Sequence, residues 1–372
     1  MHEHAAGAIV IGAGVAGAGV AWRLAQRGMN VIVVEHTEPA HAATWAAAGM
    51  LTPLAEAGHD EAFLRLSERA LSMWPAFAAE LTASGSGDPG FTASGRLQLA
   101  PDEAAAAGLR ALVASDHGRR AGAVWMDAGE AARLEPELHA GVAGAALFPG
   151  DASADPRRLG SALRTAATRA GATFVRATVT RIEHDAGGVS GVRLHDDSTL
   201  ATRTVVVAAG AWAAEVRGLP APLPVRPMRG EMYAVHARAD LLRHIVWGAG
   251  CYLVPRPDGR ILVGATMEDV GFAPGPTTAG IASLRRAAAA ACPVMATLPT
   301  IEEWAGFRPA TPDAMPILGR DARMPGLVHA SGLFRNGILL APAVADAVAA
   351  EASGDAAAVD LEPFAPMRPG LS

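Results

Sequence analysis

The segment AIVIGAGVAGAGVAWRLAQRG (residues 8–28), followed by VIVVE (residues 31–35), decides the fold of this chain. The apolar run over residues 8–11 predicts a buried parallel strand. Residues 15–27 predict a helix, which Gly28 ends just past its last turn. A second strand is predicted over residues 31–34, so the segment is a βαβ unit, the starting element of a Rossmann-like domain.

Three glycines stand between the first strand and the helix in the pattern Gly12-x-Gly14-x-x-Gly17. Gly12 permits the tight turn, Gly14 lets the backbone approach a pyrophosphate at the helix N-terminus, and Gly17 lets helix pack on strand. Glu35 ends the second strand, where it can bind both hydroxyls of an adenosine ribose and repel a 2′-phosphate, which disfavours NADP. A doubly wound domain without a cofactor is the alternative, and this full context disfavours it.

Composition narrows the class of protein further. A chain of 372 residues exceeds one compact core, so two domains are expected. Its composition, with 51% hydrophobic and 18% charged residues, is typical of a globular protein. A net charge of -6 indicates neither nucleic acid nor an acidic membrane surface as a partner. The N-terminus lacks the features of a secretory signal, and no apolar stretch is long enough to span a bilayer, so we expect a cytoplasmic protein.

The rest of the chain alternates between helix and strand patterns. Asp155-Pro156 is typical of a helix start, because an acidic N-cap precedes a proline at the first helical position, and Gly171 ends that helix. Further helices are predicted over residues 61–81 (with Pro75 kinking or dividing this one), 102–115, 128–134, 282–291 and 336–352. Strands are predicted over residues 96–100, 173–175, 179–183, 189–194, 205–209, 232–236, 252–255, 261–263 and 327–330.

The predicted fold class is therefore α/β and α+β, a Rossmann-like domain with an inserted antiparallel-sheet domain. We assign residues 1–84, 150–218 and 320–372 to the Rossmann-like domain. Residues 85–149 and 219–319 form the inserted domain.

Two further segments carry small residues in a pattern that suits a ligand. TWAAAGML (residues 44–51) lets backbone approach a planar group closely, although a tightly packed loop explains it equally well. ASGLFRNGILLAP (residues 330–342) places Gly332 and Gly337 between a strand and a helix. This second helix N-terminus can stabilise an anionic group such as the edge of a reduced flavin, or it is an ordinary strand-to-helix turn.

Five segments of the chain resemble a known protein family. AAAGML (residues 46–51), CYLVPR (251–256), GRILVGATMED (259–269), GFRPATPDAMPILG (306–319) and SGLFRNGILLAP (331–342) resemble the D-amino-acid-oxidase superfamily, and most of all its glycine oxidases. The resemblance covers nearly the whole chain in the right order. It implies noncovalent FAD as the cofactor, because covalent relatives carry a cysteine after the carboxylate-binding region and residues 308–319 contain none. The two cysteines, Cys251 and Cys292, also lack metal-ligand spacing, and no metal is expected.

The resemblance, together with the glycine turns, implies a set of site residues. The predicted FAD site comprises Gly12, Gly14, Val15, Ala16, Gly17, Glu35, His36, Thr44, Ala48, Gly49, Met50, Val179, Gly210, Gly332, Leu333, Phe334, Arg335, Asn336, Gly337, Ile338 and Leu339. The predicted catalytic residues are Arg308, Tyr252, Arg335 and Met267.

Arg308 is expected to hold the substrate carboxylate, since a planar guanidinium binds a carboxylate bidentately. The structural alternatives are a surface ion pair for Arg308, a half-buried strand position for Tyr252 and core packing for Met267. His329 lies on an apolar strand and is interpreted as structural. Two features depart from the family pattern, namely the stretch Gly248-Ala249-Gly250 before Tyr252 and the bulky Trp45 beside the small-residue loop.

The implied activity is oxidation of glycine or another small amino acid to its imine, with hydride passing from the α-carbon to flavin N5 and O2 yielding hydrogen peroxide. Thiazole formation for thiamine is the implied pathway, and homo-oligomers occur among the relatives. Other candidates are a sarcosine or D-amino-acid oxidase, a quinone-linked D-amino-acid dehydrogenase and an aminophosphonate-type amine oxidase. A non-catalytic flavin-binding module is the candidate from another class, against which the paired Arg308 and Arg335 argue.

Overall fold

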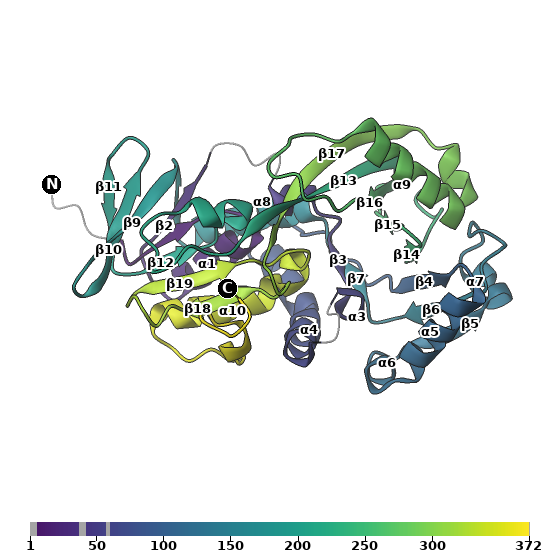
Figure 1. Cartoon of the computed structure of the whole chain (residues 1–372), viewed down its shortest axis with the longest axis horizontal. Coiled ribbons are helices and arrows are strands. Elements are labelled where there is room, and N and C mark those ends of the chain that lie inside the picture. The colour runs from purple at the N-terminus through teal and green to yellow at the C-terminus, as the bar shows by residue number, and fades with distance from the viewer. Residues whose placement is uncertain (1–5, 37–41, 57–59, 372) are drawn as a thin grey trace.

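The structure is a computed structural model of the 372-residue chain, and it describes residues 6–36, 42–56 (without the side chain of residue 56) and 60–371. Two large sheets lie toward opposite ends of its long axis, with helices packed on each (Figure 1). Two smaller sheets complete the strand inventory of the described residues. None of the helices in those ranges is long and apolar enough to cross a membrane.

The first large sheet has six strands and contains the βαβ unit. Its order is β18 (Ile317–Arg320), β19 (Leu327–Ser331), β12 (Val205–Val207), β1 (Ala8–Ile11), β2 (Val31–Glu35) and β8 (Thr173–Arg176). All neighbours are parallel except β18, which runs antiparallel to β19 at the edge. The predicted Rossmann-like sheet is thus confirmed.

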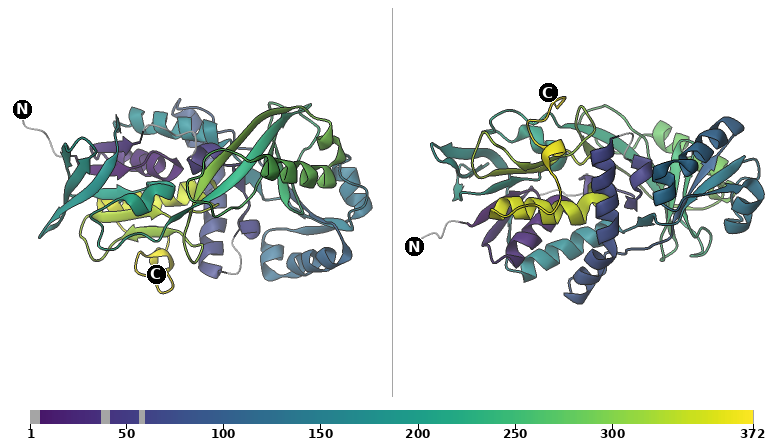
Figure 2. Two further views of the ribbon diagram at one scale, coloured as in Figure 1. Left: turned by 45° about the horizontal axis from the view of Figure 1, so that its top comes forward. Right: turned by 90° about the horizontal axis from the view of Figure 1, so that it is seen from below.

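Both faces of this sheet are covered, which explains its continuous apolar strands. Ala8 and Val10 of β1 face a helical layer, whereas Ile9 and Ile11 face the opposite side. The helical layer consists of α1 (Val15–Gln26), α4 (Glu61–Ala83), α8 (Pro156–Arg169) and α10 (Gly337–Ser353), seen from below in Figure 2. The other face packs against a three-stranded sheet of β11 (Thr199–Ala201), β10 (Gly188–Leu194) and β9 (Val179–Asp185), and against the 3-10 helix η2 (Gly210–Glu215).

The second large sheet has eight strands and comes from two stretches of chain. Its order is β17 (Thr300–Ala310), β13 (Arg226–His236), β16 (Arg260–Gly264), β15 (Cys251–Pro255), β14 (Ile245–Gly248), β4 (Arg96–Ala100), β6 (Gly144–Phe148) and β5 (Val124–Asp127). All pairs are antiparallel as predicted, except the parallel pair of β14 and β4, where the two stretches meet.

Alternation along β13 gives this sheet two different faces. Tyr233 and Val235 belong to the core under α9 (Thr278–Ala291), whereas Met232 and Ala234 face the small-residue loop that contains Ala48. The remaining elements are α2 (Ala43–Ala46), α3 (Pro53–Glu56), α5 (Glu103–Ala114), α6 (Asp116–Arg120), α7 (Ala128–Leu134), η3 (Pro293–Ala296), η4 (Glu362–Phe364) and the ribbon of β3 (Met50–Leu51) with β7 (Ala152–Ser153).

Most element boundaries agree with the sequence, with a few differences. Pro75 lies inside a continuous α4, so it does not divide that helix. α9 begins at Thr278, four residues before the predicted start, because the Thr277 side chain accepts a hydrogen bond from the Gly280 amide and caps it. The domain boundaries stay a prediction, and β18 of the first sheet already begins at Ile317, ahead of the boundary placed at residue 320.

The start of α8 joins the helical layer to the second large sheet. The Asp155 carboxylate accepts hydrogen bonds from the amides of Arg157 and Arg158, and it forms an ion pair with Arg260 at 2.8 Å. Burial alone raises the pKa of this carboxyl, but the Arg256 charge, the Arg158 amide and Arg260 outweigh it and lower the pKa overall. The group therefore contributes stability above its ordinary pKa, and this is lost as the pH falls through the lowered value.

Replacing Asp155 with Ala should lower the free energy of unfolding by about 2–4 kcal/mol at neutral pH, because a cap and a largely buried ion pair are lost together. Asp102→Ala is the matched control, since Asp102 is an exposed N-cap that accepts only from Ala105, and it should cost about 1 kcal/mol. Urea unfolding as a function of pH measures both. Equal losses in the two variants, or a loss for Asp155→Ala that persists below the lowered pKa, would contradict this role.

Candidate active site

The turn before α1 is shaped by contacts that no side chain could share. Gly12 has a φ of +100°, and a Cβ there would lie 2.4 Å from the Ala208 carbonyl oxygen. A Cβ on Gly17 would lie 1.9 Å from the carbonyl oxygen of Gly12. Gly14 is the N-cap of α1 and supplies no side-chain cap, and the Val15 amide donates to Thr44 Oγ1 at 3.0 Å. Among the described residues no acceptor is assigned to the Ala16 and Gly17 amides, so these two are available to an anionic ligand.

Glu35 reaches the same turn from the end of β2. Its carboxylate accepts a hydrogen bond from the Ala13 amide, and burial raises its pKa despite this hydrogen bond and the nearby charges of Arg164 and His36. Glu35 and His36 line a cavity together with Thr44 and the side chains at the start of α8. This arrangement suits the ribose of an adenosine placed beside the helix N-terminus.

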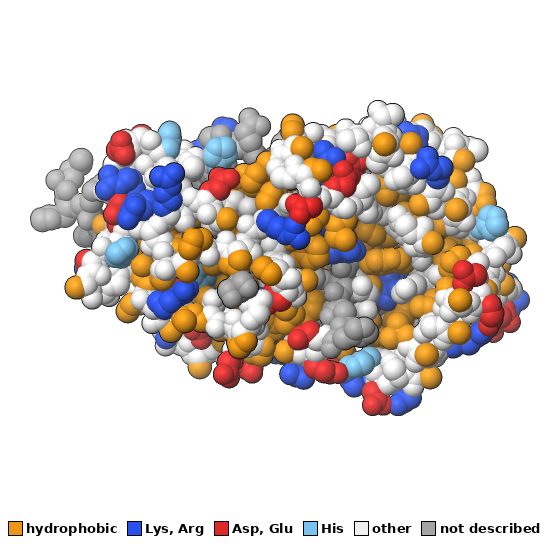
Figure 3. Space-filling view, viewed as in Figure 1, with side chains coloured by type: hydrophobic (Ala, Val, Ile, Leu, Met, Phe, Trp, Pro, Cys, Tyr) orange, Lys and Arg blue, Asp and Glu red, His pale blue; other side chains and the backbone are white. Residues whose placement is uncertain are grey.

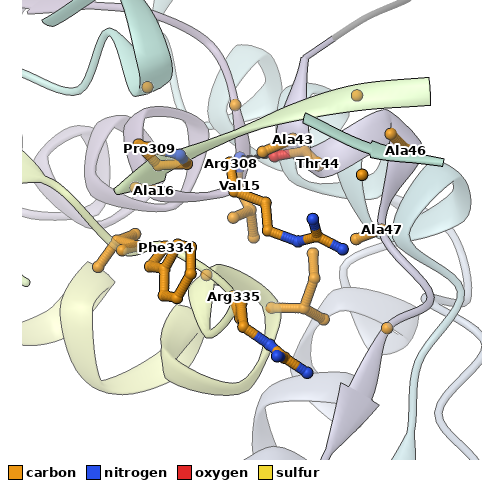
Figure 4. Close-up of a pocket in the computed structure, with 18 of the residues that line it drawn as sticks. Val15, Ala16, Ala43, Thr44, Ala46, Ala47, Arg308, Pro309, Phe334 and Arg335 are labelled. Carbon is orange, nitrogen blue, oxygen red and sulfur yellow. Dashed lines mark hydrogen bonds between the residues drawn. The ribbon is translucent and has the colours of Figure 1, made fainter. Parts of the chain in front are cut away.

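A second, adjoining cavity continues from the α1 turn toward the eight-stranded sheet (Figure 4). It has about 1020 Å³ of empty space, part of which is open to solvent. Apolar side chains line a hollow between the two halves of the molecule on the face shown in Figure 3. The second cavity is lined by Gly14, Val15, Ala16, Ala43, Thr44, Ala46, Ala47, Ala48, Gly49, Met50, Ala208, Gly210, Gly230, Met232, Tyr252, Gly306, Arg308, Pro309, Ala330, Ser331, Gly332, Leu333, Phe334, Arg335, Gly337 and Ile338.

The N-terminus of α10 opens onto this cavity. Asn336 is its N-cap but makes no side-chain capping bond, and its buried Oδ1 has no hydrogen-bond partner among the described residues. Gly337 and Ile338 in the first turn both line the cavity. The positive end of a helix dipole thus faces the cavity, as expected for a site that stabilises a negatively charged ring edge.

Arg308 enters the cavity from β17. One terminal nitrogen of its guanidinium donates to the carbonyl oxygens of Thr266, at 3.1 Å, and Arg229, at 3.4 Å. Its path requires a glycine on the neighbouring strand, since a Cβ on Gly230 would lie 2.1 Å from that nitrogen. These two backbone carbonyls help to hold the guanidinium in its orientation.

Arg335 and Tyr252 reach the cavity from other elements. Arg335 follows Phe334, whose φ of +46° is unusual for a bulky residue, and its guanidinium lies 6.0 Å from the ring centroid of Trp247. Figure 4 shows Arg308 and Arg335 extending from opposite walls toward the same side of the cavity. Tyr252 projects from β15, where its hydroxyl lies 3.9 Å from the sulfur of Met232.

Some predicted site residues are not brought to the cavities. Met267 is 59% exposed and lies outside both linings, because it follows the end of β16 in a surface loop. Val179 is buried in the core between the six-stranded and three-stranded sheets. Gly12 and Gly17 allow the tight backbone contacts of the turn and line neither cavity. Asn336 and Leu339 lie at the N-terminus of α10, next to residues that line the second cavity.

The two departures from the family pattern have structural explanations. Ala249-Gly250 form the turn of the hairpin between β14 and β15, and Gly248 packs against Ala291 of α9, so this stretch does not line either cavity. Trp45 lies on the Glu35 side, where the Arg157 guanidinium is 3.8 Å from its ring centroid. It therefore lines the cavity that contains Glu35 and not the cavity that contains Arg308 and Arg335.

Sequence reasoning missed several lining residues. Met232 lines the cavity, although Met267 was the methionine predicted to belong to the site, and Gly230 and Gly306 provide the room for Arg308. The signal was present, because Gly230 and Met232 alternate on one face of β13, but the register of that strand against β17 cannot be predicted locally.

Other reactive groups lie elsewhere. Burial raises the pKa of the Cys251 thiol to about 12, and neither Cys251 nor Cys292 is among the residues that line the two cavities, which supports noncovalent FAD binding. His329 is buried on β19, 3.4 Å from an oxygen of Asp321 and outside both linings. The described residues contain no group of three or more potential metal ligands in a suitable arrangement.

The two adjoining cavities fit an elongated dinucleotide with a ring system at one end. Glu35 and the N-terminus of α1, where no acceptor is assigned to the Ala16 and Gly17 amides among the described residues, suit an adenosine ribose and a pyrophosphate. The N-terminus of α10, whose N-cap makes no side-chain capping bond, and the small residues 46–49 suit a planar redox-active ring. Fold and site thus define the class of flavin-dependent dinucleotide-binding oxidoreductases.

Comparison with known proteins identifies the family. A family model described as FAD dependent oxidoreductase (DAO) matches residues 8–351, so the chain belongs to this FAD-dependent family, as the sequence resemblance predicted. A glycine oxidase crystal structure from Geobacillus kaustophilus is 34% identical, with a TM-score of 0.91 over 98% of this chain and 99% of that one. An iminodiacetate oxidase from Chelativorans sp. BNC1 is 30% identical, with a TM-score of 0.88 over 96% and 98% of the two chains.

A longer relative also matches. The bifunctional protein ThiO/ThiG of Trichormus variabilis (strain ATCC 29413 / PCC 7937) is 36% identical over 346 residues, or 92% of this chain. This chain spans 52% of that protein's length.

Replacing Glu35 with Ala should weaken FAD binding by about 1–3 kcal/mol, because the ribose hydroxyls would lose a buried acceptor. Titration of the apoprotein with FAD, followed by flavin fluorescence, measures the dissociation constant. Glu183→Ala is the control, since that carboxylate lies on β9 and pairs with Arg193 away from both cavities. An unchanged dissociation constant for Glu35→Ala would remove Glu35 from the cofactor site.

Proposed function

We propose that this chain catalyses FAD-dependent oxidation of glycine, or of an amino acid built on an unsubstituted glycine unit, to the corresponding imine, with O2 as the electron acceptor. The observation that carries the proposal is the Arg308 guanidinium, which donates to two backbone carbonyls in a cavity walled on another side by the small residues 46–49. A fixed guanidinium is a specific partner for a carboxylate.

The similarity to named oxidases supports this substrate class. Glycine and iminodiacetate, the substrates in the names of the two similar structures, share a carboxylate attached to an unsubstituted α-carbon that carries nitrogen. An arginine that grips the carboxylate and a wall that limits the space beyond the α-carbon would serve both. The iminodiacetate oxidase keeps N-substituted glycines open as substrates beside glycine itself.

The site residues have distinct roles in the proposed reaction. FAD, when bound, supplies the redox chemistry by accepting a hydride equivalent from the substrate and passing electrons to O2. Arg308 binds and orients the substrate carboxylate, and Arg335 adds a second positive charge that favours an anionic substrate. Tyr252 and Met232 bound the space beside the carboxylate and exclude water from it.

The reaction needs no dedicated acid–base side chain if the amine binds neutral. The contribution of the protein is then orientation of the Cα–H bond and stabilisation of negative charge by the N-terminus of α10. The match to the bifunctional ThiO/ThiG protein supports a role in supplying thiazole formation for thiamine. We also propose that the protein forms homo-oligomers and is located in the cytoplasm.

Replacing Arg308 with Ala should cost about 2–5 kcal/mol in kcat/KM for glycine, because the substrate carboxylate loses its charged partner in a secluded site. Arg308→Lys should recover only part of this loss, since an ammonium cannot form the bidentate pair. Steady-state peroxide release and the flavin spectrum are measured for each variant. The control is Arg285→Ala, because Arg285 lies on the outer helix α9, pairs with Glu303 and is about half exposed.

Two outcomes would contradict this assignment. One is a kcat/KM of Arg308→Ala for glycine equal to that of the Arg285→Ala control. The other is an equal loss on an amine without a carboxylate, which would show that Arg308 does not recognise that group.

Small substrates should be preferred over bulky D-amino acids, because Tyr252 and Met232 fill the wall next to Arg308. Glycine, sarcosine, iminodiacetate, D-Ala and D-Phe are compared by kcat/KM under air. Met232→Ala should improve D-Ala relative to glycine by about tenfold, since removal of a methylene, the sulfur and a methyl group opens space for the methyl group of D-Ala. Met295→Ala is the matched control, being a buried methionine under α9. D-Phe as the best substrate of the wild-type protein would refute the small-pocket interpretation.

A further inference from the structure

Arg256 is a buried cation behind the cavity wall. It follows β15, and only 4% of its surface is exposed. One terminal nitrogen of its guanidinium donates to Ser153 Oγ at 3.1 Å, and the other donates to the carbonyl oxygen of Ala48. Its Nε has no partner, and no carboxylate oxygen forms an ion pair with it within 4.0 Å among the described residues.

Burial of the Arg256 charge is unfavourable for stability unless other interactions compensate for it. Removing a guanidinium from water without a contacting carboxylate costs free energy that one hydroxyl and one carbonyl do not fully recover. Burial lowers the pKa of Arg256 to about 10, opposed mainly by the charge of Asp155, so the side chain stays cationic at neutral pH. Arg158 and Arg260 lie nearby with the same sign of charge, which makes the position still less favourable.

The hydrogen bond to Ala48 indicates which group the Arg256 charge acts on. The Ala48 carbonyl and the Gly49 amide belong to one peptide group, in which the N–H of a trans unit points away from the C=O. Gly49 is buried and lines the cavity, and its own carbonyl accepts from Ala154 at 2.9 Å. In the part of the chain that the structure describes, no acceptor is assigned to the Gly49 amide.

The loop cannot easily move to find another partner. Gly49 has a φ of +75°, and a Cβ at this position would lie 2.0 Å from the Ala154 carbonyl oxygen. The peptide is thus held on one side by Arg256 and on the other by the β3–β7 ribbon. A buried donor fixed in this way and left without a protein acceptor is matched to an acceptor on a ligand.

We propose that Arg256 is a positioning residue that polarises the Ala48–Gly49 peptide and so strengthens the Gly49 amide as a donor to the reduced form of bound FAD. Hydrogen bonds in a chain reinforce each other, and a cation at one end strengthens the donor at the other. Reduction adds negative charge to the flavin, so the stronger donor stabilises reduced FAD more than oxidised FAD. Arg256 consequently raises the midpoint potential of the bound cofactor. The inference depends on the FAD-binding family and not on the identity of the substrate.

The test compares Arg256→Met, Arg256→Gln and Arg256→Lys holoproteins. The midpoint potential of bound FAD is measured by spectroscopic equilibration with a reference dye, and the dissociation constant of oxidised FAD is measured separately. The neutral variants should bind reduced FAD about tenfold more weakly relative to oxidised FAD, which lowers the two-electron potential by about 30 mV. Arg256→Lys should retain most of the wild-type potential, because it keeps the charge.

Ser153→Ala is the matched control, since it removes the other hydrogen bond of Arg256 and leaves the charge beside Ala48. Its potential should equal that of the wild type. If the neutral variants keep the wild-type potential while oxidised FAD binds less tightly, Arg256 is only structural and the proposal fails. If Arg256→Met does not fold, Arg256→Gln decides, because it can still donate to Ala48, and a wild-type potential in that variant likewise overturns the proposal.

Discussion

The site depends on the close backbone contact between the first turn of α1 and the glycine turn that follows β1 at the carboxyl end of the parallel strands. Gly17 brings α1 so close to the turn that a methyl group would overlap the Gly12 carbonyl oxygen. α10 packs closely on α1, since a Cβ on Gly19 would lie 3.1 Å from the Ala345 Cβ. Two helix N-termini therefore face cavities at the carboxyl edge of the same parallel sheet, where doubly wound folds bind their ligands.

The second sheet completes the site through its long strands. β13 and β17 are paired from Arg226 with Ala310 to Val235 with Thr300, so Gly230 and Gly306 lie opposite each other and leave a channel for Arg308. Charged groups at the junction, namely Asp155, Arg256 and Arg260, link the helical layer to this sheet. The position of Arg308, the proposed carboxylate anchor, thus depends on contacts between segments far apart in the sequence.

Local chemistry made much of the fold predictable from the sequence. The βαβ unit and the start of α8 at Asp155-Pro156 were predicted, because glycine turns and N-caps act on neighbouring residues. The sequence did not predict that Met232, and not Met267, lines the cavity. Both are methionines near the ends of strand patterns, and only the register of β13 with β16 and β17 decides which one faces the cavity.

The distribution of charge in the cavity agrees with the proposed preference for a small anionic substrate. Arg308 and Arg335 come from opposite walls, whereas residues 46–50, Val15 and Ala16 supply no charge. Two cations beside a partly enclosed space attract a carboxylate more strongly than they would in water. The N-terminus of α10 adds a partial positive charge from a third direction. In the proposed reaction, oxidation of the substrate would add negative charge to the bound FAD, so the positive groups proposed to attract the substrate would also favour reduced FAD.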